Sequence, residues 1–122
     1  STRDLTEELG EHAEELFRER ARRGVKARGI IPDTPFGIRS RKEQDKYLRE
    51  VRLVPKEKFD FRTETYIYDN KLLAISFKEK FGFLVESKEI VDGLKKAWDL
   101  AWEKAKEYDE EIAQGDEKNL ET

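Results

Sequence analysis

The stretch RTETYIYDNKLLAISFKEKFGFLVES, residues 62–87, decides how this chain folds. Side chains on either side of Asp69-Asn70 alternate in the way that strands with two different faces do. Asp and Asn tolerate a positive φ better than most residues, so the dipeptide suits a two-residue hairpin loop. The sequence therefore predicts an antiparallel meander of three strands, at 59–68, 72–78 and 81–86.

Two helices are predicted on either side of this meander. Apolar residues recur at three- and four-residue spacing over residues 4–23 and again after Ser87, which is typical of amphipathic helices. Ser87 suits the N-cap of the second helix, and Gly115 is predicted to end it.

The segment between the first helix and the meander predicts two more strands and a short helix. Residues 25–31 and 51–54 alternate like strands, and residues 31–40, IPDTPFGIRS, are predicted to form a loop because they hold two prolines and a glycine. Ser40 and Glu43 have the spacing of a capping box, which predicts a helix over residues 40–49.

Length and composition indicate one domain with a small core. The chain has 122 residues, of which 36% are hydrophobic and 43% charged. We expect a single domain over residues 1–115 and a disordered polar tail at 116–122. The fold class is α/β (α+β), in the order α-β-α-β-β-β-β-α, with a mixed sheet flanked by helices.

Composition also excludes several classes of function. The absence of cysteine excludes disulfides and thiolate chemistry, and a net charge of -3 gives no basic field for nucleic acid. The sequence lacks the apolar stretch of about 20 residues that a membrane span needs. We found no phosphate-binding glycine loop, zinc motif or serine-hydrolase motif. We expect a cytoplasmic protein without a metal or cofactor.

Several segments resemble a known family. They are VKARGIIP (25–32), REVRLVP (49–55), YIYDNKLLAISFKEKFGFLVESKEIVD (66–92) and KAWDLAW (96–102). In this order they resemble the effector domain of TrmB-like transcriptional regulators, over about residues 13–106. The resemblance implies a phospholipase D-like fold behind an N-terminal winged helix-turn-helix domain.

The catalytic motif of phospholipase D-like enzymes, His-x-Lys-x4-Asp, is not kept. Placing its Asp on Asp69 sets Arg62 at the His position and Glu64 at the Lys position. A guanidinium stays protonated and cannot act as the nucleophile. Glu64 would repel the phosphate that the Lys attracts. Asp69 alone remains, and it suits a turn.

The resemblance therefore implies a non-catalytic, effector-sensing or dimerisation domain of a transcriptional regulator. We expect a homodimer that reaches DNA through a helix-turn-helix domain not present in this chain. Because no such domain precedes residue 25, an excised domain is expected, with a stand-alone relative as the alternative. Two other functions stay open: a phosphodiesterase-fold enzyme that uses Arg62, Glu64 and Asp69, and a pure protein-interaction module.

One face of the first hairpin strand is the candidate ligand site. It carries Arg62, Glu64, Tyr66 and Tyr68, whose rings and charges suit a polyol or nucleotide effector. The alternative is a half-exposed sheet face with an Arg62–Glu64 pair. Sugar is the typical effector of the family, but sugar-binding members carry additional C-terminal segments for which this chain has no room.

Trp98 and Trp102 are the candidate dimer or partner contacts, because they lie one turn apart on the last helix. Packing within the chain is the alternative. His12, the only histidine, is expected at the edge of the first helix's apolar stripe. A basic run suits either an anionic ligand or DNA, or a solvated helix end; it comprises Arg18, Arg20, Arg22, Arg23, Lys26 and Arg28.

Overall fold

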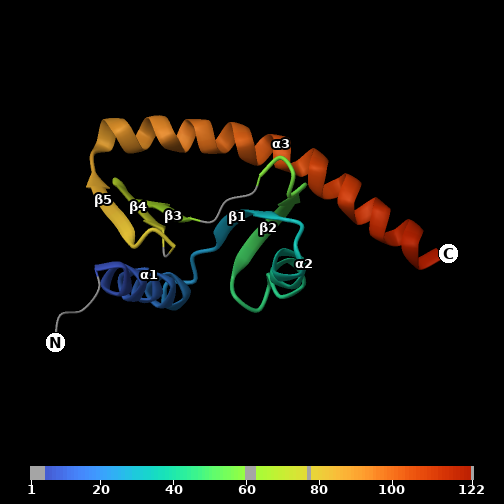
Figure 1. Cartoon of the computed structure of the whole chain (residues 1–122), viewed down its shortest axis with the longest axis horizontal. Helices are drawn as coiled ribbons and strands as arrows, with labels where there is room; N and C mark the ends of the chain where they lie inside the picture. Colours follow the sequence, from blue (N-terminus) through green and yellow to red (C-terminus); the bar gives the residue numbers. More distant parts are fainter. Residues whose placement is uncertain (1–4, 60–62, 77, 122) are drawn as a thin grey trace. The chain divides into compact units, whose positions relative to one another are not determined.

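The computed structural model describes residues 5–59, 63–76 and 78–121, with side chains from residue 7 to residue 115 within those ranges. Its described part holds three helices and five strands (Figure 1). In chain order they are α1 (Leu5–Arg22), β1 (Ala27–Pro32), α2 (Pro35–Lys42), β2 (Arg49–Val54), β3 (Glu64–Tyr68), β4 (Lys71–Ser76), β5 (Phe81–Glu86) and α3 (Lys88–Glu121). The chain is thus of the α+β class.

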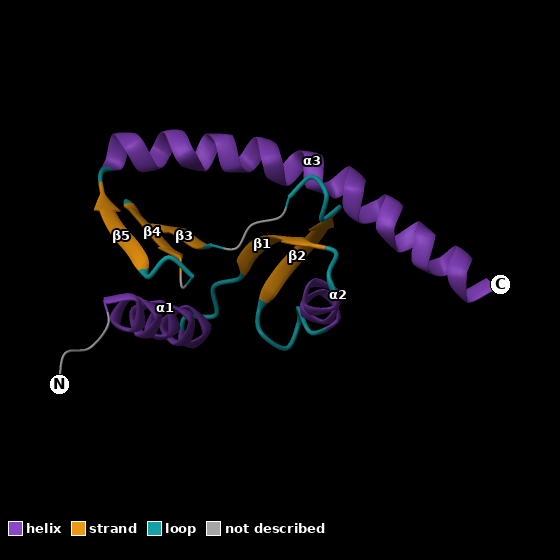
Figure 2. Cartoon of the chain, in the orientation of Figure 1, coloured by secondary structure: helices purple, strands orange, loops and turns teal. Residues whose placement is uncertain are grey.

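The described strands form two small sheets rather than the one mixed sheet expected (Figure 2). β1 and β2 are parallel, whereas β3, β4 and β5 form an antiparallel meander in that order. Contacts also divide the chain into two compact units, where the sequence predicts one domain over residues 1–115. The hairpin unit comprises Ser1–Arg23 and Phe61–Ala97, and the parallel unit comprises Gly24–Asp60 and Trp98–Thr122.

In the hairpin unit, α1 covers one face of the meander. Ala13 of α1 is buried with Leu73 and Ile75 of β4. Gly82 of β5 lies on the same face, and a Cβ there would come within 2.5 Å of Leu9 Cδ1. A side chain at this position would therefore require Leu9 to shift for the helix to lie this close to the strand.

The predicted hairpin is confirmed. Tyr68 and Lys71 are the last pair of the β3–β4 ladder, and Asp69 in the loop has a φ of 49°. Ser87 follows β5 and caps α3, since its Oγ accepts the N–H of Ile90 at 3.2 Å. The hairpin loop and the helix cap, both read from local residue types, are where the sequence places them.

The predicted end of the last helix is wrong. α3 continues through Gly115 to Glu121, so residues 116–121 are helical rather than a disordered tail. A glycine inside a helix costs about 1 kcal/mol and does not by itself end it. No proline follows Gly115 to stop the helix.

The predicted loop at 31–40 and helix at 40–49 are also wrong. α2 begins at Pro35, and the Oγ1 of Thr34 accepts the N–H of Gly37 at 3.1 Å. Thr as the N-cap and Pro in the first turn are strong helix starts. They outweigh the capping-box spacing of Ser40 and Glu43, and Glu43 is instead the C-cap of α2.

Candidate functional site

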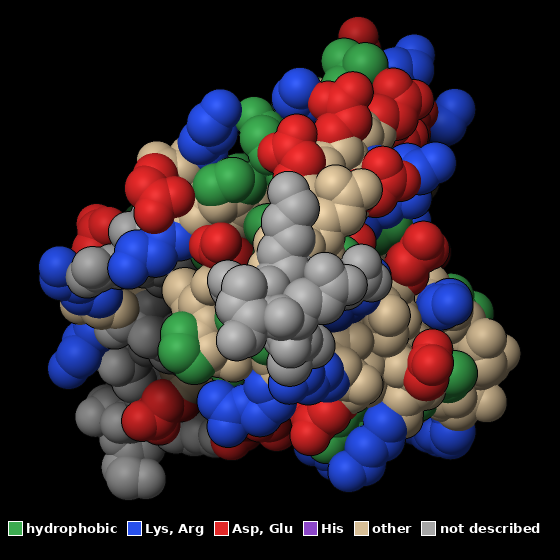
Figure 3. All heavy atoms as spheres, turned by 90° about the vertical axis from the view of Figure 1, so that its right-hand side faces the viewer, with side chains coloured by type: hydrophobic (Ala, Val, Ile, Leu, Met, Phe, Trp, Pro, Cys, Tyr) green, Lys and Arg blue, Asp and Glu red, His purple; other side chains and the backbone are tan. Residues whose placement is uncertain are grey.

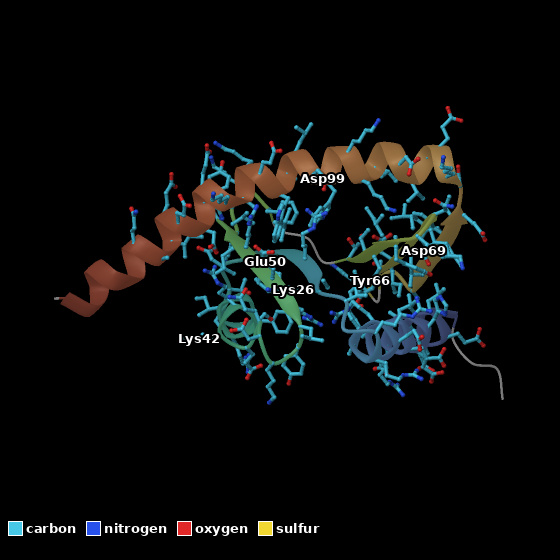
Figure 4. All side chains as sticks on the ribbon, turned by 180° about the vertical axis from the view of Figure 1, so that it is seen from behind. Lys26, Lys42, Glu50, Tyr66, Asp69 and Asp99 are labelled. Atoms are coloured by element: carbon cyan, nitrogen blue, oxygen red, sulfur yellow. The ribbon has the colours of Figure 1, made fainter. Side chains whose placement is uncertain are left out.

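Three of the four predicted ligand-binding residues lie on the face of the meander that α1 covers; Arg62 lies outside the described residues. Tyr66 is half-buried and packs against the core between the meander and α1 (Figure 4). Its ring meets that of Phe17 edge-on, with 5.2 Å between centroids. Its hydroxyl donates to Glu64 Oε2 at 2.8 Å. Much of the Tyr66 ring is therefore engaged within the chain.

Tyr68 is joined to the only histidine. The Tyr68 hydroxyl lies 3.1 Å from Nε2 of His12, which is on α1. Burial raises the pKa of Tyr68 above its ordinary value of 10.0, and the negative charges of Asp69 and Glu86 add to the shift. The protonated phenol is therefore the form of Tyr68 that lies beside His12 at neutral pH.

The surface of α1 next to His12 is hollowed. The hollow has a volume of about 470 Å³ and is lined by His12, Glu15, Leu16, Arg18, Glu19 and Arg22. Glu19 pairs with Arg22 at 2.8 Å and with Arg23 at 3.1 Å. Arg18 lies 3.5 Å from Glu14. Three arginines of the basic run thus have acidic partners on α1, which favours the solvated helix end over an anion site.

Trp98 and Trp102 lie together in the parallel unit. Their rings are stacked, with centroids 5.2 Å apart and planes at 15°. The Arg52 guanidinium of β2 sits 3.9 Å from the Trp102 ring centre, and its Nη1 donates to the Trp102 carbonyl at 2.8 Å. Arg28 of β1 lies 4.6 Å from the Trp98 ring centre and bonds Asp99 at 3.0 Å.

This stack joins the parallel sheet to the second part of α3, since cations over aromatic faces are favourable contacts. Trp102 is only 7% exposed. These contacts are those expected if the two tryptophans pack within the chain. A contact with a partner through Trp98 or Trp102 stays a prediction.

Sequence reasoning did not single out Asp109, the most connected carboxylate of the parallel unit. Its side chain is 13% exposed and forms an ion pair with Arg41 of α2. The same Oδ1 accepts the N–H of Leu53 at 2.9 Å. Asp109 thereby links α2, β2 and α3. No local pattern marks it, because its partners lie 56 and 68 residues away in the chain.

The described residues contain no group of three His, Asp or Glu side chains placed to hold a metal ion. None of the helices, over the residues that the structure describes, is both long and apolar enough to cross a membrane. Comparison with protein-family models, curated proteins and solved structures finds no match.

Proposed function

We propose that this chain is a non-catalytic regulatory domain, the effector-sensing and dimerisation part of a TrmB-like transcriptional regulator with a phospholipase D-like half. The observation that carries the proposal is the structural use of Glu64 and Asp69 in the hairpin. Asp69 lies at the hairpin turn (Figure 4) and supplies its positive φ. The backbone oxygen of Asp69 accepts Lys95 Nζ at 2.6 Å. Glu64 holds the Tyr66 hydroxyl.

With Glu64 and Asp69 in these structural roles, neither residue serves as the nucleophile or as the phosphate-binding cation of a phosphodiesterase. A carboxylate stands at Glu64, where phosphate binding needs a cation. His12, the only histidine, bonds the Tyr68 hydroxyl and lies on a different element from the motif. A nucleophile and a phosphate-neutralising cation are thus missing from the described part of the motif.

A regulatory role fits the remaining surface. Acidic and basic side chains are interspersed on the face seen in Figure 3, so that face offers DNA no field of a single sign. DNA binding is accordingly assigned to a helix-turn-helix domain outside this sequence. The proposed regulator acts in the cytoplasm. An effector at the predicted residues Arg62, Glu64, Tyr66 and Tyr68 would act by changing the separation of two such domains in a homodimer.

Turnover of a phosphodiester tests the non-catalytic part. We expect the chain to release no nitrophenol from bis(p-nitrophenyl) phosphate above the buffer rate, with or without divalent cations. The matched variant is Asp69→Asn, because Asn also tolerates the turn's positive φ while lacking the carboxylate. Turnover that this variant abolishes, with the fold retained, would favour the enzyme alternative.

The coding sequence upstream of Ser1 tests the regulatory part. A winged helix-turn-helix encoded there supports the proposal. A different catalytic or binding domain in that position contradicts it and favours the interaction-module alternative.

A further inference from the structure

β5 is an edge strand whose outer backbone groups have a definite pattern. Tyr68 and Lys71 close a two-residue loop and so form a hydrogen-bonded pair. Hydrogen-bonded and non-hydrogen-bonded pairs alternate along an antiparallel ladder. Carrying that alternation through β4 leaves Gly82, Leu84 and Glu86 with N–H and C=O groups directed away from β4. Among the described strands, none occupies that edge.

The sheet face away from α1 is apolar along this edge. Phe81, Phe83 and Val85 point to it, because Gly82 between them faces α1. Phe81 is 61% exposed and Phe83 is 43% exposed, and their ring centroids lie 6.0 Å apart. Edge strands are usually protected by an inward-pointing charge, a proline or a bulge. β5 has none of these between Phe81 and Val85.

We propose that β5 pairs antiparallel with β5 of a second copy of this chain, about a two-fold axis beside Phe83. The inference rests on the dimerisation part of the proposed function and names its interface. In this register Gly82 lies opposite Leu84 of the second copy, so two outward-directed backbone positions meet. Phe83 lies opposite Phe83, which brings the two rings together on the apolar face.

The charges that flank β5 select this register. With the axis at Phe83, Lys80, which directly precedes β5 and has a φ of 53°, comes next to Glu86 of the second copy, and the symmetry creates this pair twice. An axis at Leu84 also aligns the backbone groups, but it sets Lys80 opposite Lys88. An axis between Phe83 and Leu84 places outward-directed residues opposite inward-directed ones and forms no ladder. An axis at Gly82 also aligns the backbone groups and sets Lys78 opposite Glu86, but it leaves only Phe81, Gly82 and Phe83 of β5 in the ladder. Charge complementarity and strand overlap together thus identify a second copy as the partner and favour the axis at Phe83.

Exchanging the two charges tests both the partner and the register. Lys80→Glu gives a copy with Glu at both positions, and Glu86→Lys gives a copy with Lys at both. Each variant alone should dimerise about tenfold more weakly than the unchanged chain, since two attractive pairs become repulsive. An equimolar mixture should form heterodimers with nearly the original Kd, because each of the two pairs between positions 80 and 86 then joins a glutamate to a lysine.

Sedimentation velocity of the whole chain measures these dissociation constants. Thermal unfolding by circular dichroism checks the fold, because Glu86→Lys places a second positive charge opposite Lys71 within the sheet. Lys42→Glu, on the exposed surface of α2, is the control and should leave the Kd unchanged. Recovery in the mixture supports the interface. A dimer that none of the exchanges affects overturns the β5 interface and leaves dimerisation standing. A strict monomer at high concentration overturns both.

Discussion

Asp109 offers the sharpest test of how the parallel unit is held together. Asp109→Ala removes the acceptor of the Leu53 N–H and the partner of Arg41 together. A buried N–H without an acceptor costs about 1–3 kcal/mol, and breaking a largely buried ion pair adds to this. We expect a loss of about 3 kcal/mol in the free energy of unfolding. Asp109→Asn keeps an oxygen for Leu53 and loses only the charge, so about 1–1.5 kcal/mol is expected.

Urea unfolding followed by tryptophan fluorescence measures this loss, because both tryptophans of the chain belong to the parallel unit. Asp99→Ala is the control on the same helix. Its ion pair with Arg28 is exposed, so removing it should cost no more than about 1 kcal/mol. An Asp109→Ala loss below about 1 kcal/mol would refute the linking role. Equal losses for the Ala and Asn variants would show that the hydrogen bond to Leu53 contributes nothing.

Four further changes have expected outcomes. Gly37→Ala should destabilise the parallel unit by about 3 kcal/mol in urea unfolding, because the new Cβ would overlap the Pro32 carbonyl oxygen; Gly93→Ala, with open space around it in α3, should instead stabilise by about 0.5–1 kcal/mol. Because the folded pKa of Tyr68 is raised above 10.0, the unfolded chain loses that proton first. The contribution of Tyr68 to the stability of the hairpin unit should therefore be fully present below pH 10.0 and be lost as the pH rises through the folded pKa. Unfolding followed by circular dichroism measures this loss, and Tyr68→Phe should remove it. Phe83→Cys, in a chain without other cysteines, should form a dimer-linking disulfide under mild oxidation on non-reducing gels, because facing residues of a non-hydrogen-bonded pair lie about 4.5 Å apart at Cα. A matched Phe36→Cys variant that links equally well would contradict the register.

The features that sequence could predict are those that local chemistry determines. The hairpin depends on a two-residue loop, and Asp69 adopts the positive φ for which its residue type is suited. The Ser87 cap follows from the same kind of rule. The start of α2 is equally local, since Thr34 caps the helix and Pro35 begins it, but the two prolines and the glycine of residues 31–40 predict a loop there. That error came from choosing between two valid local rules.

Contacts between distant residues were beyond sequence reasoning. His12 and Tyr68 lie 56 residues apart, and nothing in either neighbourhood marks the other as its partner. The separation into two sheets is of the same kind, because strand alternation predicts a strand without naming its neighbour. The tryptophans show the same limit: their helical spacing is compatible with a partner contact and with a stack beneath Arg52.

Glu64 carries more weight than Asp69 in deciding between a regulator and an enzyme. The hairpin needs a residue that accepts a positive φ, so Asp at this position is favoured whether or not chemistry occurs there. Its match to the catalytic motif is therefore weak evidence for catalysis. Glu64 is under no such backbone constraint, yet under the sequence resemblance it stands where the catalytic motif has a cation, and its carboxylate accepts the Tyr66 hydroxyl. Glu64→Lys would restore the cation and release the tyrosine, but it would leave Arg62 at the nucleophile position, so we expect it to gain no phosphodiesterase activity.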